Sequence, residues 1–213
     1  MMIASASAKF VLRTSLTSPF GRKVRIAAEV LGLSSRIDIV LATTVNENDT
    51  LRQQNPLGKM PCLLLEDGSA IFDSRVIIEF LQEIAGSNQL IPASGHARYH
   101  ALTRATLADG IADAALLMVY ETRFRPPMPP EYSERWLAHQ RGKIERGLAE
   151  FERHPPDPAK TDIVAISLSC ALGYLDWRKP VAWRSQHPNI IKWLGRFTEH
   201  TPFYAKSRPE DIK

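Results

Sequence analysis

The stretch NPLGKMPCLLL, residues 55–65, sets a proline directly ahead of an apolar run. The run from Pro61 to Leu65 predicts a short buried strand, and proline is tolerated as the first residue of a strand. The peptide bond before Pro61 is either an ordinary trans bond or a cis bond, which is essentially confined to X-Pro. A cis bond would present the N–H and C=O of Met60 to a passing extended peptide. We expect the cis form.

Around this strand, strand and helix signals alternate. Short apolar or alternating runs predict four strands, at residues 9–14, 36–41, 61–65 and 70–72. Helix signals separate or follow them, at residues 18–31, 47–54 and 73–84. Asp67-Gly68 predicts the turn of a hairpin between the last two strands. The order β-α-β-α-β-β-α predicts an α/β domain of the thioredoxin-like type over residues 1–85.

The second half of the chain carries helix signals and no convincing strand. After a polar linker over residues 86–96, a helical-bundle, all-α domain is expected over residues 97–213. Its helices are predicted at residues 97–123, 131–153, 163–175 and 188–200, with proline-rich breaks at 125–130 and 154–158. The segment 163–175 is apolar nearly all round, which predicts a central buried helix. The polar tail from Lys206 onward is expected to fray.

Composition limits the classes of function. The chain has 213 residues, of which 44% are hydrophobic and 23% charged, as in soluble globular proteins. No apolar run approaches the roughly 20 residues that cross a bilayer, and the first ten residues lack the features of a signal peptide, so we expect a cytoplasmic protein without a membrane partner. Cys62 and Cys170 fit neither a disulfide pattern nor a metal-ligand spacing, so no metal is expected.

Positive charge is spread along the chain, with a net charge of +4. The densest basic patch is Arg22-Lys23-Val24-Arg25, at the start of a predicted helix. It is either a solvated helix face or a surface for nucleic acid. No nucleic-acid-binding motif accompanies the patch, so we expect the solvated face and no nucleic-acid partner.

Three places in the first half carry candidate chemistry. Ser18, with Thr17 beside it, lies at a helix N-terminus, where unpaired N–H groups and the helix dipole favour an anion such as a thiolate. At Met60-Pro61, the backbone N–H and C=O of Met60 can pair with an extended peptide. Asp73 and Ser74 open another helix and suit the amine and carboxylate of an amino acid. Each place has a plain structural alternative, a helix cap or an ordinary proline. Ser15 is expected to point away from the site.

The motifs together resemble a known family. NPLGKMP, followed twelve residues later by DSRVI at 73–77, is similar to the glutathione-binding core of cytosolic glutathione transferases. SPF at 18–20 and CALGYLDWR at 170–178 resemble the first and the central helix of bacterial members. The resemblance implies a homodimer that takes glutathione as co-substrate and a hydrophobic electrophile as second substrate.

The resemblance also implies roles for single residues. The backbone of Met60, before Pro61, would pair with the cysteinyl part of glutathione, and Asp73 and Ser74 would take the γ-glutamyl group. Lys59 would lie near the glycyl carboxylate. Ser18, or alternatively Thr17, would donate a hydrogen bond to the thiolate.

An electrophile pocket between the domains would include the residues Leu16, Tyr120 and Phe124. Arg75 would lie near the partner subunit. Gly21 stands where glutaredoxins carry their second cysteine, so dithiol chemistry is excluded.

Two departures and two other functions stay open. Family members commonly carry Glu or Gln where Asp73 stands. In the capping box before the central helix, Asp162 replaces Ser or Thr, and Ala165 replaces the acid. The alternatives to a transferase are a glutathione-dependent isomerase or reductase and a non-catalytic glutathione-binding or regulatory protein of the same fold.

Overall fold

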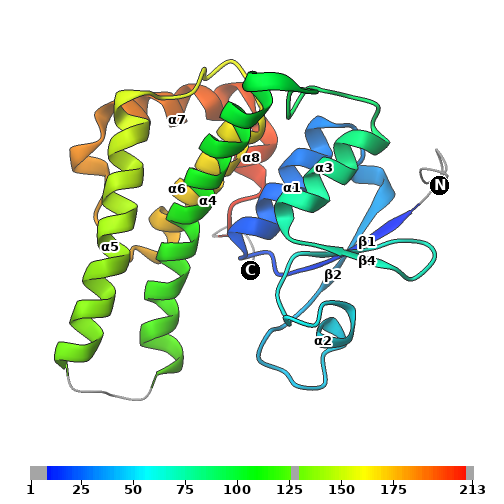
Figure 1. Cartoon of the computed structure of the whole chain (residues 1–213), viewed down its shortest axis with the longest axis horizontal. Coiled ribbons are helices and arrows are strands. Elements are labelled where there is room, and N and C mark those ends of the chain that lie inside the picture. Colours follow the sequence, from blue (N-terminus) through cyan, green and yellow to red (C-terminus); the bar gives the residue numbers. More distant parts are fainter. Residues whose placement is uncertain (1–8, 126–129, 210–213) are drawn as a thin grey trace. The chain divides into compact units, whose positions relative to one another are not determined.

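The computed structural model describes residues 9–125 and 130–209 (Figure 1). The chain divides into two compact units. The first unit contains the described residues up to Arg98 together with those from Phe203 onward, and the second contains Tyr99–Pro202. In the described residues, no helix is both long enough and apolar enough to cross a membrane.

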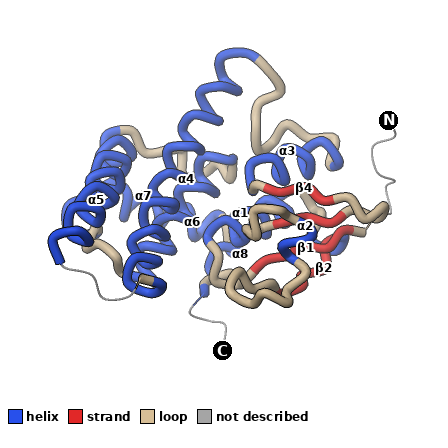
Figure 2. Tube along the Cα trace, turned by 60° about the horizontal axis from the view of Figure 1, so that its bottom comes forward, coloured by secondary structure: helices blue, strands red, loops and turns tan. Residues whose placement is uncertain are grey.

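A four-stranded sheet forms the first unit's centre (Figure 2). Its strands are β1 (Phe10–Thr14), β2 (Ile37–Leu41), β3 (Cys62–Leu64) and β4 (Ala70–Phe72), in the order β2-β1-β3-β4. β1 runs parallel to β2 and antiparallel to β3, and β3 pairs antiparallel with β4. The β1–β2 pair is parallel because a helix connects the two strands, whereas β3 and β4 form the hairpin predicted at Asp67-Gly68.

Helices α1 (Pro19–Val30) and α3 (Ser74–Ile84) pack against each other. Val24 and Ile26 of α1, with Ile77 and Leu81 of α3, are fully buried. Ile77 and Leu81 are four residues apart, which is the spacing of the core-facing stripe of an amphipathic helix. The sequence-based prediction of an α/β, thioredoxin-like order is therefore confirmed.

Helix α2 (Leu51–Gln54) is shorter than the predicted segment over residues 47–54. Asp49 explains the difference. Its carboxylate accepts hydrogen bonds from the backbone N–H groups of Thr43 and Leu51, both at 2.8 Å, and pairs with Arg13 at 2.6 Å. These bonds hold the preceding residues in a loop, so the helix begins only at Leu51.

The second unit is helical, as predicted. Its helices are α4 (Gly95–Phe124), α5 (Pro130–Arg153), α6 (Ile163–Arg178) and α7 (Pro188–His200), and the first turn of α4 belongs to the first unit. Part of the predicted break over 125–130 lies outside the described residues. Twelve residues of α6 are buried, which confirms the central buried helix. Asp162 caps α6 alone, accepting from the N–H groups of Val164 and Ala165 at 3.0 Å.

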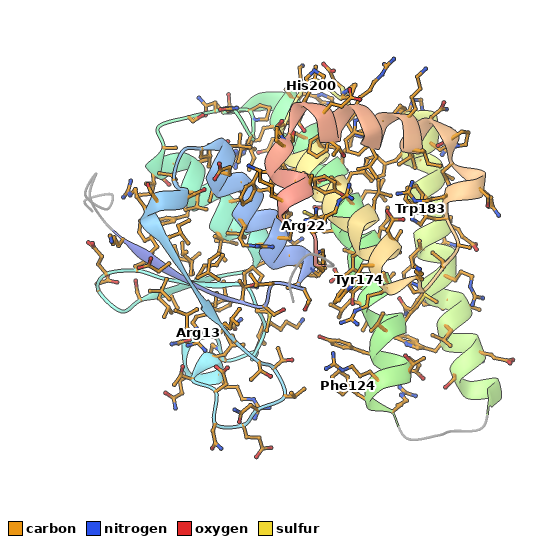
Figure 3. The ribbon with its side chains drawn as sticks, turned by 180° about the vertical axis from the view of Figure 1, so that it is seen from behind. Arg13, Arg22, Phe124, Tyr174, Trp183 and His200 are labelled. Carbon is orange, nitrogen blue, oxygen red and sulfur yellow. The ribbon has the colours of Figure 1, made fainter. Side chains whose placement is uncertain are left out.

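The last short helix, α8 (Pro202–Lys206), returns to the first unit and corrects two expectations. Arg22 is buried, not solvated: its guanidinium lies 4.1 Å from the ring centre of Tyr204 and donates to the Tyr204 carbonyl (2.6 Å) and the Ser207 hydroxyl (3.0 Å). Lys23 is buried as well. The described tail after Lys206 is held in place, since Ser207 is only 2% exposed. Figure 3 labels Arg22 on α1.

Candidate functional site

The sheet register brings three chain segments to one end of the sheet. Arg13 of β1 lies opposite Cys62 of β3, and Cys62 lies opposite Phe72 of β4. The residues just beyond these positions, from Thr14 onward, at Pro61 and at Asp73, therefore share that end. The strand–helix loop, the proline and the helix start that the sequence analysis singled out meet there.

The loop ahead of Pro61 is built around Asn55, which is buried. Its side-chain amide donates to the carbonyl of Lys59 (2.7 Å), and its side-chain oxygen accepts from the N–H of Leu57 (3.0 Å). A backbone bond from Gly58 to the Asn55 carbonyl closes the turn. The Asn55 side chain thus bonds backbone groups that have no partner in a regular strand or helix, and it fixes the conformation of the loop that leads into β3.

The Met60–Pro61 peptide bond is cis, which confirms the prediction from the sequence. The Met60 side chain reaches the other loop of the site: its sulfur accepts a hydrogen bond from the N–H of Ser15 at 3.0 Å. Lys59 is exposed at the rim of the same loop.

Hydroxyl groups gather at the start of α1. The hydroxyls of Ser15 and Thr17 are 3.2 Å apart, whereas Ser15 had been expected to point elsewhere. The Ser18 oxygen accepts from the N–H of Gly21 at 3.1 Å and caps α1. Accepting that bond leaves the Ser18 proton free to be donated, since a hydroxyl carries one donor and two acceptor positions. Leu16 lies between these residues and is partly buried.

Gly21 has no room for a side chain. A Cβ built there would lie 1.9 Å from the hydroxyl oxygen of Thr14, which is itself fully buried. A second cysteine at this position would require Thr14 to move. Packing therefore supports the exclusion of dithiol chemistry that composition had suggested.

At the start of α3, Asp73 already has a partner in its own chain. Its carboxylate accepts from the Arg75 backbone N–H (2.9 Å), from Arg75 Nε (3.1 Å) and from Nη2 (2.8 Å). Hydrogen bonding by the Arg75 side chain is the main cause that lowers the pKa of Asp73, with smaller contributions from the Arg75 backbone and the charges of Arg75 and Lys23. A carboxylate has about four lone-pair positions, so Oδ2 can still accept from an amine.

Ser74 is buried, and its hydroxyl has no partner among the described residues. The first turn of α3 also carries N–H groups that no residue within the helix can pair. The exposed Asp73 and the hydroxyl of Ser74 thus place an acceptor and a donor side by side, which suits an ammonium and a carboxylate.

Tyr120 and Phe124, predicted for an electrophile pocket, lie on α4 in the second unit. Their rings are in edge contact, with centres 5.0 Å apart. Phe124 is half exposed. Tyr120, Phe124 and Leu16 stay predictions as pocket residues.

Sequence reasoning missed Ser15, the side chain of Met60 and the pairing of Arg75. The available signal was the short run of hydroxyl residues from Ser15 to Ser18, which already suggested that more than one hydroxyl could share the turn. Nothing in the sequence indicates that the sulfur of Met60 reaches Ser15, because the two residues are 45 positions apart.

Comparisons with known proteins identify related sequences and structures. A family model described as the N-terminal domain of glutathione S-transferase matches residues 17–84, and one described as the C-terminal domain matches residues 134–196. The uncharacterized GST-like protein YibF of Escherichia coli (strain K12) is 33% identical over 200 residues, covering 92% of this chain and 96% of YibF.

Two crystal structures of a glutathione transferase family member from Pseudomonas fluorescens Pf-5 are also similar. One, with bound glutathione, has a TM-score of 0.85 and 39% identity and covers 94% of this chain and 99% of that chain. The other, with bound S-(propanoic acid)-glutathione, has a TM-score of 0.81 and 38% identity and covers 94% and 100%. The chain belongs to the glutathione S-transferase family.

Proposed function

We propose that this protein is a glutathione transferase, which activates the thiolate of glutathione for attack on a hydrophobic electrophilic small molecule. The observation that carries the proposal is the meeting of three features at one end of the sheet: the hydroxyls at the start of α1, the cis bond before Pro61, and the start of α3 with Asp73 and Ser74. The glutathione-bound and glutathione-conjugate-bound relatives from P. fluorescens support it.

Each feature has a chemical task in this proposal. Asp73 Oδ2 accepts the γ-glutamyl amine, and Ser74 donates to the neighbouring carboxylate. The backbone of Met60 pairs with the cysteinyl unit, and Lys59 lies by the glycyl end. The Ser18 hydroxyl donates to the sulfur, assisted by the positive end of α1. The thiolate then attacks the electrophilic carbon, forms the carbon–sulfur bond and displaces the leaving group.

A cytoplasmic, thiol-rich compartment suits this chemistry. Neither Cys62 nor Cys170 forms a disulfide, and both are buried, as is usual in compartments where disulfides do not form.

We also propose a homodimer. Phe72, on the edge strand β4, is 38% exposed, and Val76, in the first turn of α3, is 53% exposed. A second copy would cover this apolar surface. Sedimentation of Val76→Glu should show a shift toward a 23.9 kDa species, whereas Val45→Glu, an equally exposed valine after β2, should sediment like wild type. A 23.9 kDa species for the wild type at micromolar concentration would refute the dimer.

The test of the main proposal separates binding from activation. Calorimetry would measure glutathione affinity, and ultraviolet absorbance of the thiolate would give the pKa of the bound thiol. We expect binding together with a bound-thiol pKa well below the free value of about 8.5. Turnover of 1-chloro-2,4-dinitrobenzene would then rise and level off with pH at that lowered pKa.

Glutathione binding with an unshifted thiol pKa and no turnover would refute the transferase and leave the non-catalytic alternative. No binding of glutathione would refute both. Ser74→Ala serves as the variant that should weaken binding without altering the thiol pKa.

A further inference from the structure

A cluster of aromatic and basic side chains lies where α4 and α6 run side by side in the second unit (Figures 1 and 2). α4 contributes Tyr120, Arg123 and Phe124 within a single turn, and α6 contributes a matching turn, Tyr174, Trp177 and Arg178. Figure 3 shows Phe124 and Tyr174 on one side of this helix pair. We call these six residues the aromatic–arginine cluster.

The two arginines of the cluster lie over aromatic rings. The guanidinium carbon of Arg178 is 3.6 Å from the ring centre of Trp177, and that of Arg123 is 5.2 Å from the ring centre of Phe124. Such stacking holds a guanidinium by its face and leaves its edge for hydrogen bonds. Arg178 uses part of this edge for a side-chain hydrogen bond with Tyr174, and its other N–H groups can donate to a planar anion.

Neither arginine has a carboxylate partner in the described part of the chain. In contrast, Arg125 pairs with Glu121 (3.2 Å), and Arg184 pairs with Asp176 (2.7 Å). The C-terminal end of a helix attracts a basic residue, which explains one cation on each helix. The attraction to helix ends does not explain why both arginines lie close enough to lower the pKa of the same phenol.

That phenol is Tyr174, which is only 5% exposed. Burial is the main cause that raises its pKa, and the positive charges of Arg178 and Arg123 oppose the rise. Tyr120 raises the pKa of Tyr174 further, as a neighbouring group that ionises to the same sign does. Four polar side chains from two helices therefore share one small region: two arginines and two phenol hydroxyls, bordered by Phe124 and Trp177.

We propose that the aromatic–arginine cluster binds the carboxylate of an electrophile that also carries an aromatic or apolar group. Arg123 and Arg178 would supply charge-assisted hydrogen bonds, Tyr174 and Tyr120 would supply hydroxyls, and the rings would cover the apolar part. The assignment of the bound molecule as the second substrate rests on the proposed transferase function. The affinity of the cluster for a carboxylate does not depend on that proposed function.

The first experiment measures binding without glutathione. Calorimetry would compare 4-phenylbutanoate with 4-phenyl-1-butanol, which have the same apolar part and differ in charge. We expect the wild type to prefer the acid by roughly tenfold, since a charge-assisted hydrogen bond contributes more than a neutral one. Arg123→Gln/Arg178→Gln should abolish the preference. Arg141→Gln, a matched loss of an exposed charge on α5, should keep it.

The second experiment measures turnover with 4-(chloromethyl)benzoate and 4-(chloromethyl)benzyl alcohol. In both, glutathione sulfur bonds to the benzylic carbon as the carbon–chlorine bond breaks and chloride leaves. The wild-type ratio of kcat/KM should favour the acid and fall to near one in the double variant, through KM. Tyr174→Phe should reduce the ratio in part.

The outcomes separate the two claims. Arginine-dependent binding of the acid without turnover of either electrophile would refute the transferase and uphold the carboxylate site. No preference for the acid in the wild type, or the same preference in the double variant with an unchanged circular dichroism spectrum and Tm, would overturn the carboxylate site.

Discussion

The sulfur of Met60 accepts a hydrogen bond from the backbone N–H of Ser15 at 3.0 Å and so ties the loop before β3 to the loop before α1. The second loop carries the Ser15, Thr17 and Ser18 hydroxyls. The residue proposed to pair with glutathione through its backbone thus also positions, through its side chain, the loop proposed to hold the thiolate.

Replacing Met60 by leucine keeps the volume of the side chain and removes the sulfur acceptor. We expect kcat to fall several-fold while glutathione affinity stays near wild type, because the Met60 backbone is unchanged and only the loop with the hydroxyls loosens. Steady-state kinetics with calorimetry would check this. Met118→Leu, a buried methionine of α4, is the control. A loss of affinity with unchanged kcat would contradict a positioning role.

Replacing Ser18 by alanine should cut the rate about tenfold to a hundredfold, since a hydrogen bond to a charged group contributes roughly 1.5–3 kcal/mol. The pKa of the bound thiol should rise, and glutathione affinity should stay nearly intact. The cap on the Gly21 N–H is lost as well, so the unfolding free energy should fall by about 1 kcal/mol. A pH–rate profile would measure the first effect and thermal denaturation the second.

Thr17→Ala and Ser15→Ala decide which hydroxyl acts. If only Thr17→Ala raises the thiol pKa, the catalytic role belongs to Thr17. If Ser15→Ala has the same effect as Thr17→Ala, the 3.2 Å contact between their hydroxyls orients the donor. If none of the three variants changes the profile, backbone N–H groups stabilise the thiolate and the assignment to Ser18 is wrong.

Gly21→Ala should destabilise the protein by about 1–3 kcal/mol, because the new methyl group collides with the hydroxyl of Thr14. Thr14→Ala removes the colliding oxygen, so the double variant should recover part of the loss. A double-mutant cycle from chemical denaturation would measure the coupling. Gly142→Ala, in α5 beside a flexible arginine, is the control. Additive effects of Thr14→Ala and Gly21→Ala would show that the two positions do not collide.

Asp49→Asn should show a pH-dependent effect on stability. The N–H groups of Thr43 and Leu51, followed by the charge of Arg13, lower the pKa of Asp49 in the folded protein. A lowered folded pKa gives a stabilisation that is complete above the unfolded value of about 3.9 and disappears as the pH falls through the folded value. The Tm of Asp49→Asn should therefore lie below wild type at pH 7, and the gap should close in acid.

The carboxylate of the exposed Asp38, on β2, accepts no hydrogen bond among the described residues, so Asp38→Asn is the control. If the Tm difference between Asp49→Asn and the wild type stays constant from pH 7 into acid, the charge of the carboxylate does not contribute to stability.

Local patterns were enough to predict the element order, the hairpin and the bend at Pro61, because each depends on residues adjacent in the chain. The buried helix α6 was predictable for the same reason, since its apolar residues surround it completely. Asp162 as its cap was also readable, because the N–H groups that it accepts from lie two and three residues later.

Partners distant in sequence escaped prediction. The run Arg22-Lys23 looks like any solvated helix face, and the atoms that bury Arg22 come 182 and 185 residues later. The end of the chain looked frayed because polar residues dominate it, yet Ser207 is buried against Arg22. In the site, the same limit hid the bond between Met60 and Ser15. Pairings of this kind arise from the fold and leave no periodicity in the sequence.

The return of α8 to the first unit sets an order on how the protein is made. The ribosome releases α1 long before Tyr204 and Ser207, which follow the whole second unit in the chain. Until these two residues emerge, the guanidinium of Arg22 lacks the ring and the oxygens that bury it. The first unit is therefore completed only after the second, and a fragment ending before residue 203 would leave a charged side chain in its core without those acceptors.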